Sequence, residues 1–206
     1  EPNLYLWSDV AYSKSGINDR TFVMCNLGYS TALNIAWSDS YGSSLTNNVQ
    51  FVFSTPLKSS KMAFNGGSGI GSGMITYTYL GNVPDWDIGY VYTTNAGANW
   101  SNTVLDNSPN RTRSVDIQAV RGVNNSFKIA YTMDSASSTY GYYVGGFHSN
   151  FTQPNKVRVT NQGVDTAFTK IIAGYKLGGG DDCFAVYSSG PGNNVTASTL
   201  CQSTVG

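Results

Sequence analysis

The stretch around Trp86 contains side chains well suited to hold a ligand. Trp86 lies between two carboxylates, Asp85 and Asp87. An indole ring can stack on the C–H groups of a sugar, while carboxylates accept hydrogen bonds from its hydroxyls. This interpretation requires an exposed Trp86. The alternative is that Trp86 packs in the seam between structural units and that the charges only solvate the rim.

Two arginines and a tyrosine complete the predicted site. Arg111 and Arg113 alternate in a strand-like stretch, so both could reach an acidic sugar or another chain. Tyr29 belongs to a turn that we expect on the same face of the molecule. The predicted ligand-binding residues are therefore Tyr29, Asp85, Trp86, Asp87, Arg111 and Arg113.

Metal-dependent and triad chemistry have few candidate residues. His148 is the only histidine, so a zinc site or a Ser-His-Asp triad would depend on this one side chain. The loop Gly178–Asp182 could bind calcium through its oxygen atoms, but it lacks the alternating acidic ligands of calcium loops, which favours a hairpin loop. We predict no catalytic residue, no metal site and no cofactor.

Strands must position these residues, because the composition is that of an all-β protein. Charged residues make up 12% of the 206 residues, about half the usual share, while 23 Gly and 14 Tyr are present. Tyr favours strands and Gly favours turns. The formal net charge is zero and Lys and Arg do not cluster, which argues against nucleic-acid binding. No apolar run approaches the length of a membrane span. We expect a secreted, extracellular protein.

The cysteines predict one disulfide. Cys183 and Cys201 flank a hairpin whose midpoint falls on Gly192, so they should lie opposite each other on paired strands. We expect a bond between them, against the alternative of two reduced core thiols. Such a bond would place the protein in an oxidising compartment. Cys25 is left unpaired and is expected to be a small buried residue.

A repeat of about 53 residues divides the chain into four strand-rich units, approximately 1–54, 55–107, 108–160 and 161–206. The landmarks of the first strand are Val10, Met62, Val115 and Phe168. Those of the second are Cys25, Thr78, Tyr131 and Tyr187, and those of the third are Trp37, Tyr92, Phe147 and Leu200. Three units show a fourth strand, at Val52, Leu105 and Val159. Four antiparallel strands at this period predict the blades of a single β-propeller domain, with a β-sandwich or jelly roll as the alternative.

The fourth unit ends after its third strand, so its fourth strand must come from elsewhere or be absent. Residues 3–7, including Leu6 and Trp7, could complete this blade and close a ring. The alternative is a loop between blades, because Pro2 aligns with Pro56 and Pro109. An open sheet edge would instead invite another chain.

The turn Thr93–Trp100, with the sequence TTNAGANW, resembles the Asp-box (BNR) turn of sialidase-like propellers, with Asn95 in the place of the Asp. A weaker version spans Ser38–Leu45. The resemblance implies a propeller fold and a structural role for the turn. The polar side chain should cap backbone amides, Gly97 should adopt the open backbone angles and Trp100 should pack beneath.

The resemblance does not extend to sialidase chemistry. That family uses an arginine cluster for a carboxylate and a Tyr–Glu nucleophile pair, but Glu1 is the only glutamate here. Adjacent carboxylates such as Asp181 and Asp182 favour a solvated turn over a hydrolytic pair. We therefore expect a non-catalytic binding module for a glycan or an extracellular protein surface. The alternatives are a self-assembling structural protein, which would be a homo-oligomer, and a degenerate glycoside hydrolase.

Overall fold

A computed structural model describes residues 6–15, 18–27, 29–39, 43–45, 47–65, 71–81, 85–107, 112–119, 126–135, 138–147, 157–158, 169–175, 181–189 and 194–201. Every regular element in these ranges is a β-strand. The all-β prediction is therefore confirmed. The described strands form four sheets, and within each sheet consecutive strands pair antiparallel.

The sheets follow one another along the chain. The first contains β1 (Leu6–Ser15), β2 (Asn18–Leu27), β3 (Ala32–Ser38) and β4 (Asn47–Val52). The second contains β5 (Leu57–Phe64), β6 (Gly73–Leu80), β7 (Trp86–Thr93) and β8 (Ser101–Asp106). The third contains β9 (Thr112–Ala119), β10 (Ser126–Ser135), β11 (Ser138–Phe147) and β12 (Val157–Arg158). The fourth contains β13 (Thr169–Tyr175), β14 (Asp181–Ser189) and β15 (Asn194–Cys201).

Corresponding landmarks of the sequence lie on corresponding strands. Val10, Met62 and Val115 belong to β1, β5 and β9, the first strands of their sheets. The second-strand and third-strand landmarks likewise lie on the second and third strands of all four sheets. Phe168 and Val159 fall outside the described residues. Each sheet therefore lies within one of the four expected units.

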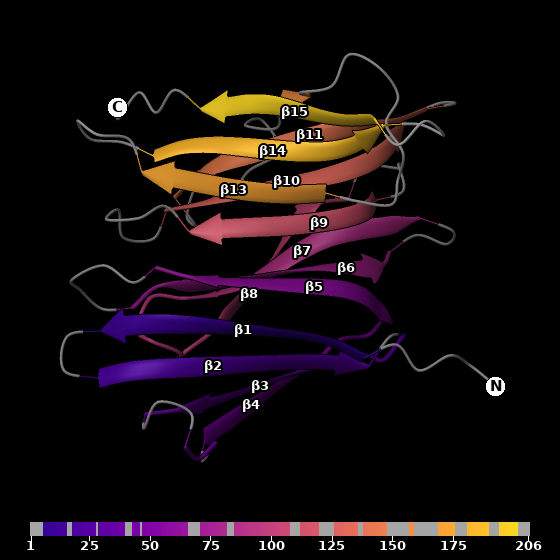
Figure 1. Ribbon diagram of the computed structural model, residues 1–206. Coiled ribbons are helices and arrows are strands. Elements are labelled where there is room, and N and C mark those ends of the chain that lie inside the picture. The colour runs from indigo at the N-terminus through magenta and orange to yellow at the C-terminus, as the bar shows by residue number, and fades with distance from the viewer. Residues whose placement is uncertain are drawn as a thin grey trace.

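The four sheets are stacked, with their first strands next to one another in the order β1, β5, β9, β13 (Figure 1). The first and last sheets lie at opposite ends of the stack, so the described sheets do not close a ring. Both predicted roles of the N-terminal segment were wrong for Leu6 and Trp7. These residues begin β1 and pair with Leu27 and Asn26 of the first sheet, because the hairpin ladder extends farther than the sequence pattern suggested.

Apolar side chains fill the spaces between sheets. One cluster joins the first two sheets and consists of Phe22, Met24, Leu33, Ile35, Leu57, Met62, Phe64, Ile75, Tyr77 and Val91. A second joins the second and third sheets and includes Met74, Ile88, Tyr90, Leu105, Val115, Ile117, Phe127, Ile129, Tyr131 and Met133. The second sheet is thus buried on both faces. Consecutive residues of β6 point to opposite clusters, Met74 to one and Ile75 to the other.

The cysteine predictions have different outcomes. Cys183 of β14 and Cys201 of β15 are paired in register, so their expected opposition is confirmed. The bond between them stays a prediction. Cys25 is a free cysteine, but the expectation that it is buried was wrong, because its side chain is exposed on β2.

The turn after β7 has the expected capping pattern. Asn95 Oδ1 accepts a hydrogen bond of 2.9 Å from the backbone N–H of Asn99, and Thr93 Oγ1 accepts one of 3.0 Å from that of Gly97. Gly97 has φ of 85°, the left-handed conformation that glycine adopts most easily. Trp100 packs edge-on against Phe51, with ring centroids 5.9 Å apart. These local expectations are confirmed, and the polar side chains stabilise the turn itself.

This turn also joins the first two sheets. Arg20 of β2 donates a hydrogen bond to the carbonyl oxygen of Ala96 and forms an ion pair of 2.5 Å with Asp39. A Cβ at Gly97 would lie 2.9 Å from the ring of Phe22, so the turn packs closely on the first sheet. The turn therefore has a structural role, because it connects the second sheet to the first.

Candidate ligand-binding site

The structure buries Trp86 instead of exposing it. Trp86 begins β7, and its side chain is only 6% exposed. The ring of Tyr29 contacts it edge-on at a centroid distance of 5.9 Å, and Lys58 Nζ lies 5.6 Å from the indole centroid. The expectation of an exposed stacking platform was therefore wrong, because Tyr29 of the β2–β3 turn and Lys58 of β5 lie against the ring.

Tyr29 is the exposed member of this aromatic pair. Its side chain is 58% exposed, and its φ of 61° places a non-glycine residue in the left-handed region, which costs about 1–2 kcal/mol. The backbone N–H of Tyr29 donates a hydrogen bond of 2.8 Å to the carbonyl oxygen of Leu57, which holds this conformation. The strained turn thus presents an aromatic ring to solvent beside Trp86.

Asp87 is an internal carboxylate. Its residue is 5% exposed, and burial raises its pKa, with further contributions from the nearby charges of Asp106 and Asp85. A hydrogen bond from the Tyr79 hydroxyl partly offsets this rise, because it lowers the pKa of Asp87. Asp106, itself buried, accepts a hydrogen bond of 3.1 Å from the hydroxyl of Tyr131. These carboxylates are engaged with tyrosines inside the sheets, whereas Asp85 is half-buried at the start of the segment.

The arginines of the predicted set cannot be placed beside this group. Arg111 lies outside the described residues, and for Arg113 the structure describes only the backbone, in β9. The structure therefore brings together Tyr29, Trp86 and the two aspartates of the predicted set. Binding by the arginines stays a prediction.

A pocket of about 280 Å³ lies where the first sheet passes into the second. Its lining residues are Val52, Phe53, Ser54, Thr55, Tyr77, Tyr79, Asn102 and Val104, and we call it the tyrosine pocket. None of these side chains carries a formal charge at neutral pH. The pocket therefore combines aromatic rings with hydroxyl and amide groups.

Hydrogen bonds and ring contacts organise the wall of the tyrosine pocket. The Tyr77 hydroxyl donates a bond of 2.5 Å to Asn102 Oδ1, and its ring lies 4.7 Å from that of Phe53 and 5.8 Å from that of Tyr79, centroid to centroid. Burial raises the pKa of Tyr77 above its usual value. Burial, together with the charge of Asp87, raises the pKa of Tyr79 to about 12. Both phenols therefore stay protonated and neutral at physiological pH.

The tyrosine pocket adjoins the predicted face but was not predicted itself. Tyr79 pairs in register with Asp87 on one side and with Leu57 on the other. The signal in the sequence was the alternation of Tyr77 and Tyr79, which places both rings on one face of a strand. Nothing in the sequence showed that Phe53, from the chain segment after β4, would pack against them.

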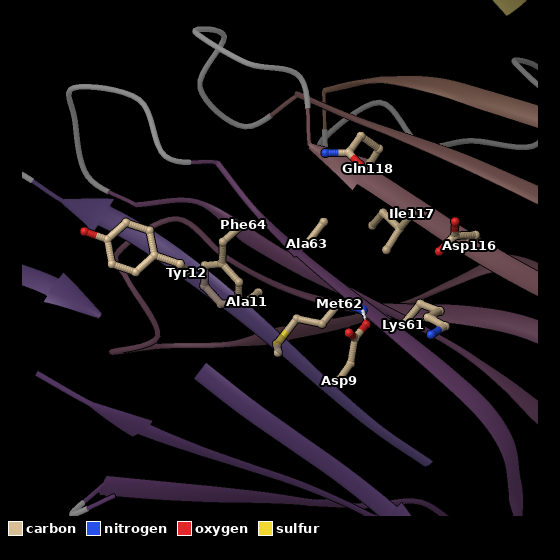
Figure 2. A pocket seen from close by; sticks show the side chains of 10 residues that line it. All are labelled: Asp9, Ala11, Tyr12, Lys61, Met62, Ala63, Phe64, Asp116, Ile117 and Gln118. Carbon is tan, nitrogen blue, oxygen red and sulfur yellow. Dashed lines mark hydrogen bonds between the residues drawn. The ribbon is translucent and has the colours of Figure 1, made fainter. Parts of the chain in front are cut away.

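A second pocket, of about 250 Å³, lies along β1, β5 and β9 (Figure 2). Asp9, Lys61 and Asp116 give it a polar lining. Asp9 has a structural role, because both of its carboxylate oxygens accept backbone hydrogen bonds. One accepts a bond of 3.0 Å from the N–H of Met62, and the other accepts a bond of 3.0 Å from the N–H of Val10. Since the first of these bonds joins β1 to β5, we interpret the pocket as a seam between sheets.

Among the described residues, no three His, Cys, Asp or Glu side chains gather where they could hold a metal ion. Within the same part of the chain there is no helix long and apolar enough to cross a membrane. Neither family models nor curated proteins match this sequence. The assignment of a function therefore depends on the geometry of the site.

Proposed function

We propose that this protein is a non-catalytic binding module that holds a neutral carbohydrate in the tyrosine pocket. The observation that supports the proposal is the lining itself, which combines tyrosine rings, an amide and hydroxyls without any charged group. Sugars present C–H faces to aromatic rings and hydroxyls to neutral hydrogen-bonding groups. The pocket offers both kinds of contact within one small space.

Asn102 is the polar group best placed to bind a hydroxyl. Its side-chain oxygen accepts the bond from Tyr77, so the amide nitrogen keeps two N–H donors for a ligand. Asn102 is exposed at the strand β8, at the edge of the second sheet. Because the Tyr77 hydroxyl fixes the amide orientation before binding, little conformational entropy is lost when a ligand accepts from it.

The size and charge of the pocket narrow the ligand class. Its volume of about 280 Å³ is just below the range of roughly 300–1,000 Å³ for small-molecule sites, which suits one sugar ring. With no cation in the lining, the carboxylate of an acidic sugar would remain unpaired, and the buried carboxylate of Asp87 behind Tyr79 would repel it. We therefore favour a neutral monosaccharide unit at the end or side of a longer glycan.

The test is an array of immobilised neutral and acidic saccharides, followed by calorimetry on each hit. Asn102→Ala should weaken binding of a neutral sugar about tenfold, since it removes the donors and the partner of Tyr77. Asn99→Ala is the matched control, because Asn99 is exposed in the β7–β8 turn and is held there through its backbone N–H. Absence of neutral-sugar binding at millimolar concentration, or equal binding by the Asn102 and Asn99 variants, would overturn the proposal.

A further inference from the structure

The first sheet has a face that none of the other described sheets covers. Phe22 and Met24 of β2 point into the cluster shared with the second sheet, so Val23 and Cys25 point the other way. Val10 pairs with Val23, and Val23 pairs with Ala36, which places these three side chains in one row across the sheet. We call this outward side of β1–β4 the end face. Val10 is 64% exposed there, although it is a large aliphatic residue.

The equivalent rows in the next two sheets are buried. Met62 pairs with Ile75 and Ile75 with Val91 in the second sheet, and these side chains are 6%, 0% and 0% exposed. All three belong to the cluster shared with the first sheet, which is the preceding sheet in the chain. The row across strands β5–β7 therefore packs against the sheet before it.

The third sheet repeats this arrangement. Val115 pairs with Tyr131, and Tyr131 pairs with Tyr142. Val115 is 6% and Tyr131 0% exposed, and all three side chains pack in the cluster shared with the second sheet. The row of Val10 thus lies on the first three strands of its sheet, as do these two rows, each of which is covered by the preceding sheet. Among the described residues no sheet covers the row of Val10.

The composition of the end face is that of a contact surface. Val10 and the neighbouring rows contain Ser8, Tyr12, Thr21, Val23, Cys25, Asn34, Ala36, Asn48 and Gln50, none of them charged. Tyr12 is 47% exposed. Sheet surfaces that remain in water usually carry charged side chains that prevent association. The next row of the same ladder does carry charge, since Lys14 pairs with Asp19. The uncharged rows around Val10 therefore form a patch beside this charged pair, which is the pattern of a contact surface with a polar rim.

We propose that the last sheet, β13–β15, of a second copy of this chain packs on the end face. Within the chain each contact follows one rule: β5 packs next to β1, β9 next to β5 and β13 next to β9. The described neighbours of β13 outside its own sheet belong to the third sheet, and β13–β15 end the stack opposite the end face (Figure 1). If β13 of one copy packs next to β1 of the next copy in the same way, the stack of sheets continues from one copy to the other. Such a head-to-tail contact closes into a ring or continues as a filament, depending on the rotation per copy.

Sedimentation velocity of the full chain over a wide concentration range tests this. We expect the mass to rise from 22.1 kDa to at least twice that value as concentration increases. Val10→Lys should raise the dissociation constant at least tenfold, because the contact would bury an unpaired ammonium group. Val104→Lys is the matched control, since Val104 is 49% exposed on β8 and lies off the end face. Equal melting temperatures will show that both variants are folded.

The free thiol of Cys25 reports on the same face. Its alkylation by a maleimide should slow as wild-type concentration rises, but not in the Val10→Lys variant. A Cys25→Ser variant should associate like wild type, which separates packing from an intermolecular disulfide. A constant mass of 22.1 kDa at all concentrations would overturn the proposal. Equal weakening of association by the Val10 and Val104 substitutions would overturn it as well.

Discussion

Replacing Trp86 by alanine tests whether the most conspicuous aromatic residue of the predicted site belongs to the packing. A buried tryptophan removes about 150–250 Å² from water, which at about 25 cal/mol per Å² corresponds to roughly 4–6 kcal/mol. Alanine retains a small part of this area, so we expect Trp86→Ala to lower the free energy of unfolding by about 3–5 kcal/mol. The edge contact with Tyr29 contributes about 0.5 kcal/mol of this loss, the low end of its range, because Tyr29 is 58% exposed.

Urea unfolding followed by far-UV circular dichroism measures this loss. A change of this size is a third or more of the stability of a typical domain, so the unfolding midpoint should move far to lower urea. Trp86→Phe keeps an aromatic ring against Tyr29 and should cost less than half as much. If both variants unfold at the wild-type midpoint with the wild-type slope, Trp86 contributes nothing to packing and the description of this seam is wrong.

Two further predictions concern ionisation and covalent structure. Because burial raises the pKa of Asp87 in the folded state, its contribution to stability is present below the unfolded value of about 4 and is lost as pH rises through the folded pKa. Asp87→Asn should therefore remove this fall and be more stable than wild type at pH 7, with urea midpoints from pH 4 to 8 as the measurement; a steeper fall in the variant would contradict the reasoning. Cys183 and Cys201 should be joined by a disulfide that adds about 3 kcal/mol by closing a loop of about 19 residues. Peptide mapping without reduction that finds both thiols alkylated would disprove the bond.

The sequence was informative about strands and their spacing. Alternation of apolar and polar residues and the period of about 53 residues led to the first three strands of each sheet, and Val10, Met62 and Val115 lie on equivalent strands. The turn around Asn95 could also be predicted in detail, because capping and left-handed glycine are local properties. The start of β1 was missed, since the length of a ladder depends on its partner strand.

Contacts between sheets could not be predicted in the same way. Trp86 was a plausible exposed platform in the sequence, yet Tyr29 of the β2–β3 turn and Lys58 of β5 lie against it. The tyrosine pocket depends on Phe53, whose neighbours Tyr77 and Tyr79 are more than 20 residues away in the chain. A single sequence shows which face of a strand is apolar, but it does not show which distant segment arrives there.

The end face illustrates the same limit and also how the structure resolves it. Val10 and Met62 look alike in the sequence, as apolar residues on the first strand of a unit. In the structure Met62 is 6% exposed and Val10 is 64% exposed, because only Met62 has a preceding sheet against it. A monomer would be expected to carry charged residues next to Val10, but the nearest rows contain none, and the charged pair Lys14–Asp19 lies beyond them on the same face. The exposed patch around Val10 therefore resembles the covered rows of the second and third sheets, which is the reason to seek its cover in a second copy.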